Sequence, residues 1–552
     1  MAHSMSLNQA AGLQGMLKSG HTHINDGAVY RNIDASKELS SIVRSSLGPN
    51  GMSKLVVNHL GKIIVTSDCA TIVKELEIEH PAAKMLELAS TMQDNECGDG
   101  TNLAVSFAGE LLTLTQDLLR SGLHTSEVIA GYKKASEQLY ELLPTLTVKT
   151  VSNLNHTTVE SCDDLLSVLT PVLAAKQFGS EATLAPLVAE ACRAIMPPPT
   201  SKASVSPDSV RIAKVLGGSM SHSRVIHGYV AMRGVETSIT SVKENVKVTV
   251  FGCGVEASGT EAKGTVLMNN ANDLKTYNKS EEDKMEEIIK AIADTGTNVV
   301  ISGGTVSEMA LHFLERYKIM CLRVPSKWEL RRACSATGAT ALVRLGPATP
   351  DEIGACSSVH VEEVGDKHIT IFSHDKNSTT SSQGNLSTIL LRASTSSTLQ
   401  DMERAIDDGV HAAKMACKDG RLVPGAGATE MELAVKIRNF ADSCPGLEQY
   451  AIRAFAKALE CVPHTLAENA GLDSGAVIAS LAAAHANGNI HAGVDIEACG
   501  MEDADGVDLN TKVLDLLVTK ASAFRLAVDA VLTVLKVDQI IMAKKAGGGK
   551  PK

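Results

Sequence analysis

Aromatic residues are scarce in this 552-residue chain, where they make up 3% of the sequence and include a single tryptophan. The core must therefore be built from Ala, Val, Leu, Ile and Met, within a hydrophobic content of 44%. So few rings disfavour a surface on which single-stranded nucleic acid stacks its bases. The net charge of −11 likewise argues against nucleic acid or an anionic membrane as a partner.

Several common sequence signatures are also missing. The 12 cysteines contain no C-x-x-C pair and the 17 histidines no H-E-x-x-H, which favours reduced thiols in a cytosolic protein over a disulfide scaffold or a zinc site. No apolar run approaches about 18 residues, and the N-terminal residues lack a signal-peptide pattern. We therefore expect a cytoplasmic protein with no membrane segment. A Walker sequence and an internal repeat are absent as well.

What the chain does contain is a division into helical ends and a strand-rich middle. The length suits about three or four domains of about 150 residues each. Strands alternate with helices over residues 219–363, which indicates an α/β module. The economical interpretation is a split outer domain with inserted domains. Residues 1–25 are expected to form a loose arm, and residues 368–395 a β-hairpin.

The central motif lies between two apolar helical patterns within residues 80–119. A Gly-Asp-Gly elbow at residues 98–100 interrupts them, and Thr101 or Asn102 can cap the second helix. Glycines allow the backbone to approach a ligand, and free N–H groups at a helix start attract anions. Asp99 would suit Mg²⁺ bound to phosphates. The alternative is an ordinary helix–helix turn with a capping aspartate.

Two further acidic positions stand near turns or helix starts. Asp68 follows a predicted hairpin over residues 54–66 and precedes a helix that begins at about Ala70. Asp407 and Asp408 are adjacent on a helix that ends at Gly420, before a second glycine-rich turn. The residues alone do not separate the roles of these two neighbours.

Five stretches together resemble the group II chaperonins: LGPNGMSK (47–54), TSDCATIV (66–73), GDGTN (98–102), MERAIDDGVHAA (402–413) and RLVPGAGATE (421–430). The resemblance runs from about Gly12 to Ala546. Residues 326–342, 444–458 and 534–544 are also similar to one subunit type of the eukaryotic cytosolic members.

The resemblance implies a multidomain α+β and α/β protein of chaperonin architecture. Its parts would be a mostly helical split equatorial domain (1–148 and 403–552), a small intermediate domain (149–218 and 367–402), and an α/β apical domain (219–366) with a helical lid protrusion at about 267–287. It further implies a double ring with seven paralogous partners in each eight-membered ring. ATP hydrolysis would close the lid over unfolded polypeptides of the actin and tubulin class, delivered by a prefoldin-type chaperone.

The resemblance also implies roles for particular residues. Asp68 and Asp408 match the aspartates that position the attacking water, and Asp99 the ligand of Mg²⁺, with K⁺ as a further candidate ion. Nucleotide-binding positions would be Leu47, Gly48, Pro49, Gly100, Thr101, Asn102, Leu103, Ala174, Ala175, Lys176, Gly425, Ala426, Gly427, Asp515 and Lys520. Without the resemblance, Lys176 reads as an exposed lysine at a helix end. Asp408 would complete the site only through a closing movement, and Lys176 would reach the γ-phosphate.

Three departures from the family pattern bear on the rate of hydrolysis. Ala426 replaces a common glycine and could crowd the nucleotide, Asn102 replaces a common threonine, and Ala393 a common glycine. Three functions remain open at this point: an ATP-driven folding subunit, a ring subunit that binds nucleotide but hardly hydrolyses it, and a free-standing metabolic ATPase. The helix over 330–342 is either a client contact or a solvated helix packed on the sheet.

Overall fold

The computed structural model describes residues 22–24, 27–58, 61–152, 154, 159–198, 201–256, 271–374, 386–497 and 506–542. The chain forms two compact units. The first consists of residues 1–152, 158–182 and 404–552, and the second of residues 153–157 and 183–403. The first unit thus joins both ends of the chain around an inserted middle. The finer division into equatorial, intermediate and apical segments stays a prediction.

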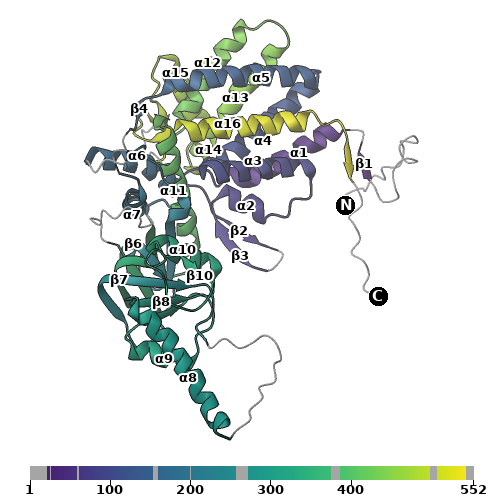
Figure 1. Ribbon diagram of the computed structural model, residues 1–552. Coiled ribbons are helices and arrows are strands. Elements are labelled where there is room, and N and C mark those ends of the chain that lie inside the picture. Colours follow the sequence, from purple (N-terminus) through teal and green to yellow (C-terminus); the bar gives the residue numbers. More distant parts are fainter. Residues whose placement is uncertain are drawn as a thin grey trace. The chain divides into compact units, whose positions relative to one another are not determined.

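Helices dominate the first unit (Figure 1). They are α1 (Ala28–Arg44), α2 (Cys69–Glu75), α3 (Pro81–Cys97), α4 (Thr101–Arg120), α5 (Thr125–Leu142), α6 (Val159–Lys176), the larger part of α11 (Ser396–Lys418), α12 (Ala428–Ser443), α13 (Glu448–Leu459), α14 (Cys461–Asn469), α15 (Ser474–Ala486) and α16 (Leu517–Leu535). A short 3₁₀ turn, Leu143–Leu146, follows α5.

The core of this unit joins helices from the two ends of the sequence. The ring of Phe107 on α4 lies edge-on to Phe455 on α13 and to Phe524 on α16, with centroid distances of 5.4 and 5.3 Å. All three side chains are fully buried. Such edge-to-face pairs each add about 0.5–1.5 kcal/mol beyond the burial of their area. Three of the eight phenylalanines therefore pack together where the two ends of the chain meet.

Short sheets complete the first unit. The predicted hairpin is confirmed as β2 (Lys54–Val57) paired with β3 (Ile63–Thr66). A three-stranded sheet has the order β17 (Leu514–Leu516), β14 (Arg421–Pro424), β4 (Lys149–Thr150), and β15 (Gly493–Val494) pairs with β16 (Val507–Asp508).

The expected loose arm is wrong for part of its length. Residues Thr22–Ile24 form β1, which pairs antiparallel with β18 (Ile540–Met542). The two strands are over 500 positions apart in sequence, so only the folded chain brings them together. The remaining residues of the arm lie outside the described part of the chain.

The second unit is built on a large sheet whose strands run in the order β5-β13-β6-β12-β11-β7-β8-β9, with β10 beside β7. Their bounds are β5 (Val210–Leu216), β6 (Arg224–Ala231), β7 (Ser241–Phe251), β8 (Val299–Ser302), β9 (Met320–Arg323), β10 (Ala341–Leu342), β11 (Gly354–Val364), β12 (Lys367–Ser373) and β13 (Ser387–Ala393). The helices are most of α7 (Glu181–Ile195), α8 (Ala271–Asp294), α9 (Glu308–Arg316) and α10 (Lys327–Thr337). Short 3₁₀ turns occur at Pro207–Ser209 and Met220–His222.

The parallel strands β7, β8 and β9 alternate with α8 and α9, which confirms the predicted α/β module. Strand β8 is buried along its whole length, as parallel strands covered on both faces are. The predicted lid at about 267–287 overlaps the N-terminal part of α8, and residues 267–270 lie outside the described part of the chain. On α10, Leu330 and Ala333 are buried in the core under the sheet, whereas Trp328 is exposed.

The predicted hairpin over residues 368–395 is wrong. Strands β12 and β13 do not pair with each other but lie on opposite sides of β6, which bonds to both: Ile371 is opposite Val230, and Ile389 is opposite Val225. Two neighbouring apolar runs with a polar connection are typical of a hairpin. Here a third strand, equally apolar and over 130 residues earlier, takes the place between them.

Among the described residues, no helix is long and apolar enough to cross a membrane.

Candidate functional site

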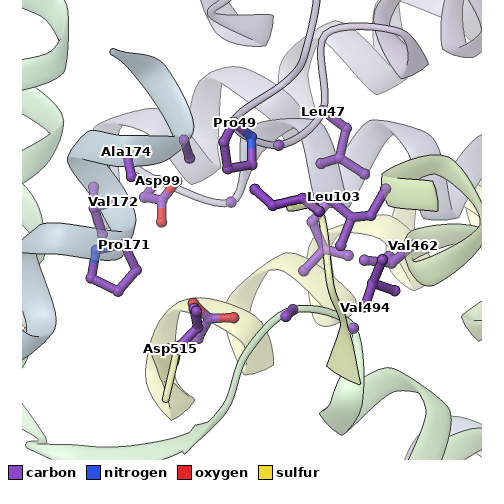
Figure 2. A pocket seen from close by; sticks show the side chains of 18 of the residues that line it. Leu47, Pro49, Asp99, Leu103, Pro171, Val172, Ala174, Val462, Val494 and Asp515 are labelled. Atoms are coloured by element: carbon purple, nitrogen blue, oxygen red, sulfur yellow. The ribbon is translucent and has the colours of Figure 1, made fainter. Parts of the chain in front are cut away.

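A cavity of about 690 Å³ lies within the first unit, walled by segments from both ends of the chain. Its size is in the range of ligand pockets. Figure 2 shows Asp99 on the same side of this cavity as Pro171, Val172 and Ala174, with Leu103 and Val494 across from them. One side therefore carries a carboxylate beside α6, and Leu103 and Val494 contribute apolar side chains across from it.

The Gly-Asp-Gly elbow is held in a conformation that requires glycine. Gly98 ends α3 with φ +71° and Gly100 precedes α4 with φ +78°. A Cβ at Gly98 would lie 2.4 Å from that of His411. The side chain of Gln93 donates hydrogen bonds to the carbonyl oxygens of Asp99 (2.7 Å) and Thr519 (3.2 Å). The elbow is thus fixed to both α3 and α16, and the first residues of α4 line the cavity.

The turn around Leu47 lies beside the start of α4 and is anchored to it. Asn102 donates from Nδ2 to Ser46 Oγ (3.0 Å) and the Val43 carbonyl (3.3 Å), and Asn469 donates to the Leu47 carbonyl (2.8 Å). The departure from threonine at position 102 therefore has a structural consequence. The carboxamide of Asn102 reaches two acceptors at once and connects the start of α4 to the turn around Leu47.

Lys176, the last residue of α6, lines the cavity and bridges two aspartates. Its Nζ lies 2.6 Å from Asp68 Oδ1 and 3.3 Å from Asp408 Oδ2. Asp68 also caps α2, where its Oδ2 accepts hydrogen bonds from the amide (3.0 Å) and hydroxyl (2.7 Å) of Thr71. Asp408 Oδ2 is buried and accepts no hydrogen bond from any described residue. A cation between two buried carboxylates is thus already assembled in one unit.

The environments of these carboxyl groups drive their pKa values apart. Burial opposes the ionisation of Asp68, but the Lys176 ammonium and the Thr71 hydrogen bonds outweigh it and hold the pKa of Asp68 below its ordinary value. Burial raises the pKa of Asp408 well above normal, and the charges of Asp68 and Asp99 add to the effect against the opposing lysine. Burial likewise raises the pKa of Asp99. Pairs separated in this way are typical of acid–base sites.

The far wall is organised around a second buried lysine. Lys520 Nζ lies 2.8 Å from Glu430 Oε1 and 3.0 Å from Asp515 Oδ2. Burial works against its charge, but the two carboxylates prevail and raise the pKa of Lys520. Lys520 is therefore engaged by protein carboxylates, and Asp515 has one oxygen tied to it.

Ala426, on the same wall, adopts a left-handed backbone with φ +52°, which is unusual for a residue with a Cβ. Its carbonyl accepts a hydrogen bond from the amide of Val494 (2.9 Å). The departure from glycine therefore places strain in the cavity wall itself.

The structure brings most of the predicted site residues to this one cavity. Its lining includes Leu47, Gly48, Pro49, Asp99, Gly100, Thr101, Asn102, Leu103, Ala174, Ala175, Lys176, Ala426, Gly427, Asp515 and Lys520. Asp68 and Asp408 stand behind the lining, in contact with it through Lys176. Gly425 is also behind it, where a Cβ would lie 3.1 Å from Asp515 Oδ2.

Asp408 meets Lys176 within one compact unit. Lys176 is paired with Asp68 and Asp408. That a closing movement completes the site around ATP, and that Lys176 reaches the γ-phosphate, stay predictions. The structure also separates the adjacent pair left open by the sequence: Asp407 is exposed, whereas Asp408 is buried.

Sequence reasoning missed Gln93, Glu430 and the wall formed by residues 494–497. Glu430 could have been found, since an acidic residue in the first turn of a helix after a glycine-rich turn is a recognisable signal. The other two follow no local pattern. They were placed by contacts between distant segments.

The donor set fits a magnesium ion bound with phosphates. Among the described residues, no group of three or more His, Cys, Asp and Glu side chains forms a metal cage. Mg²⁺ commonly takes only one or two protein carboxylates when phosphates supply the other oxygens. Asp99 at the cavity wall offers a hard oxygen ligand of that kind.

A helical unit formed from both chain ends, an inserted α/β unit and a glycine-rich cavity with buried carboxylates agree with the expected chaperonin architecture. The sequence profile of the TCP-1/cpn60 chaperonin family matches residues 39–545, and the chain belongs to that family.

Known proteins similar to the chain include T-complex protein 1 subunit theta from three organisms. The Homo sapiens protein is 47% identical over 550 residues, which cover 99% of this chain and 97% of the relative. The Arabidopsis thaliana protein is 48% identical over 542 residues (98% and 96%), and that of Dictyostelium discoideum 45% over 542 residues (98% of each). The resemblance to one subunit type of the eukaryotic chaperonin is thereby confirmed.

Proposed function

We propose that the chain is an ATP-hydrolysing subunit of a hetero-oligomeric chaperonin that folds other proteins. Family membership and similarity to proteins named as T-complex subunits support this proposal. The single observation that carries the chemistry is the Lys176 ammonium held between Asp68 and Asp408 at the wall of a cavity that also contains Asp99.

The two sides of the cavity suit the two ends of ATP. The triphosphate would lie toward Lys176 and the glycine-rich elbow, where N–H groups at the start of α4 favour negative charge. The base and ribose would lie toward the apolar side chains of Leu103 and Val494. Asp99 would hold Mg²⁺, which when bound neutralises charge on the phosphate oxygens.

The separated pKa values suggest distinct roles for the two aspartates behind Lys176. Asp68 remains ionised and is oriented by Thr71, so it is suited to position a water molecule by accepting its hydrogen bond. Asp408 has a raised pKa and an oxygen without a hydrogen bond, which suits a base that takes the proton of that water. Lys176 would exchange one of its carboxylate contacts for the terminal phosphate when ATP binds.

Assembly and cellular role follow from the family. We propose an eight-membered ring with seven paralogous subunits, stacked as a double ring in the cytoplasm, with clients of the actin and tubulin class supplied by a prefoldin-type chaperone. The exposed apolar side chains of Leu55, Val57 and Ile63 on the β2–β3 hairpin are compatible with a subunit that is covered by neighbours. K⁺ remains a candidate second ion.

The adjacent pair on α11 provides a matched test. ATP turnover is measured in particles where this chain carries the intact site, and compared with particles that carry Asp408→Asn or Asp407→Asn. Loss of a general base lowers turnover by about 100-fold or more, so D408N should abolish the contribution of this subunit while D407N leaves it unchanged. Equal turnover in both variants would refute the assignment.

A second candidate, a ring subunit that binds nucleotide but hardly hydrolyses it, is favoured by one observation. Ala426 places a methyl-bearing residue in a left-handed conformation where the family commonly has glycine. In that case ATP would bind with ordinary affinity, and D408N would change nothing because the wild-type subunit contributes no turnover. The free-standing metabolic ATPase is disfavoured by family membership.

A further inference from the structure

One buried histidine of the first unit has no place in the proposed chemistry. The side chain of His485, on α15, has no exposed surface. Its Nδ1 lies 2.8 Å from Glu432 Oε2 on α12, and its Nε2 lies 2.9 Å from the carbonyl oxygen of Ala492. Glu432 is itself buried and forms an ion pair with Lys436 at 3.2 Å.

The chemistry of these neighbours determines the positions of the protons. A carbonyl oxygen only accepts, so Nε2 of His485 must carry a hydrogen and donate it to Ala492. Nδ1 faces the Glu432 carboxylate at 2.8 Å. Both ring nitrogens are satisfied, and breaking either contact would leave a buried polar group without a partner.

The surroundings make this polar pair unusual. The neighbouring core consists of apolar side chains that include Met431, Val477, Leu481 and Val494. An apolar residue at position 485 would fill such a core without the cost of removing an imidazole and a carboxylate from water. What the histidine adds is a directional hydrogen bond to one particular carbonyl.

That carbonyl stands at the start of a cavity wall. Ala492 precedes β15, and residues 494–497 line the cavity. The amide of Val494 donates to the carbonyl of Ala426 (2.9 Å), and a Cβ at Gly493 would lie 3.1 Å from that of Ala426. The position of Ala492 therefore determines how closely this wall approaches the left-handed turn at Ala426.

We propose that His485, oriented by Glu432, is a positioning residue for nucleotide binding: its hydrogen bond to Ala492 holds the wall of residues 492–497 against the Ala426 turn. The inference rests on the proposed ATP site and concerns its nucleoside side. It assigns His485 no contact with the nucleotide. Its effect is on affinity, through the shape of the wall.

Two amide substitutions separate this role from simple core packing. Glutamine can place a donor near Nε2 and asparagine near Nδ1, so H485Q retains a donor for Ala492 whereas H485N retains one only for Glu432. Affinity for ATP and ADP is measured by titration of the purified full-length chain with fluorescent analogues. Circular dichroism and urea denaturation of each variant show whether it is folded. The control is H464Q, which alters a half-exposed histidine beside Glu468 that does not line the cavity.

We expect H485N to bind both nucleotides about tenfold more weakly than wild type, because it loses the hydrogen bond that holds Ala492 in place. H485Q keeps that hydrogen bond and should bind within about threefold of wild type. H464Q should be unchanged. If H485N does not fold, the double variant H485L/E432Q replaces it, since that pair leaves no carboxylate beside an apolar side chain. It should fold and still bind weakly.

Equal affinities of folded H485N and H485Q would overturn the proposal and leave His485 as a core residue. So would wild-type affinity in folded H485L/E432Q. A wild-type chain that binds neither nucleotide would instead overturn the proposed ATP site, so the two failures are distinguishable.

Discussion

Replacing Lys176 with methionine tests whether the buried cluster has been interpreted correctly. The substitution preserves the length of the side chain and removes the one cation between Asp68 and Asp408, whose side chains are only 10% and 9% exposed. Removing one partner of a buried ion pair costs about 3–5 kcal/mol because the remaining charge is left unpaired. Asp68 keeps its two hydrogen bonds from Thr71, so we expect the lower end, about 3 kcal/mol.

The pH dependence of that cost identifies its origin. In K176M the two carboxylates face each other without a cation, so their pKa values rise and the folded state takes up protons more readily than the unfolded chain. Stability of the variant should therefore increase as the pH falls from 8 toward 5. Urea denaturation of the purified chain at several pH values measures this. The double variant K176M/D408N should recover most of the loss at neutral pH, because one charge of the repelling pair is gone.

A matched control comes from an exposed pair. Lys134 lies beside Glu448 with about half of its side chain exposed, where solvent screens the attraction between the two charges. K134M should thus be nearly as stable as wild type at every pH. The interpretation would be refuted if K176M were as stable as K134M at pH 7.5, or if D408N gave no recovery in the K176M background.

Three further predictions concern single residues. Burial raises the pKa of Asp408, so its carboxyl group favours folding most below the ordinary pKa of 3.8 and loses that contribution as the pH rises through its folded-state pKa. D408N should remove this decline in stability when urea midpoints are measured from pH 4 to 8. An unchanged pH profile would contradict the raised pKa. A426G should raise the free energy of unfolding by about 1 kcal/mol by relieving the left-handed strain at φ +52°; a lower urea midpoint would show that the methyl group contributes more by packing. N102A should lower the free energy of unfolding by about 1 kcal/mol because the hydrogen bonds to Ser46 and Val43 are lost. The stability of N102T should lie between those of N102A and wild type. Equal stability of all three chains would mean that these hydrogen bonds are not needed.

Elements with a strong local signal could be predicted from the sequence. The amphipathic pattern and glycine stop around residues 80–119 correspond to α3 and α4, whose boundary falls at Gly98 and Gly100. The hairpin of β2 and β3 was also predictable, because its two strands and its turn lie within a few residues. Strand partners at long range were not. The insertion of β6 between β12 and β13 depends on sheet pairing that no local period encodes.

The candidate site divides in the same way. The sequence could nominate Asp68, Asp99 and the pair at 407–408, because carboxylates beside glycines and helix starts indicate phosphate or metal chemistry. It could not choose between Asp407 and Asp408. A single step along a helix turns a side chain by about 100°, and only the packing of α11 shows which of the two faces Lys176.

By itself, the sequence determined the composition of the core, the helical ends around a strand-rich middle, the glycine-rich turns and the family. These depend on residue type and on spacing within a few turns of chain. The tertiary structure decided which charges meet: Lys176 with Asp68 and Asp408, Lys520 with Glu430, and His485 with Glu432 and Ala492. Apart from the contact of His485 with Ala492, which lies seven residues further on, each pairing joins segments far apart in sequence. Their proximity results from how the apolar faces pack, which no stretch of sequence specifies alone.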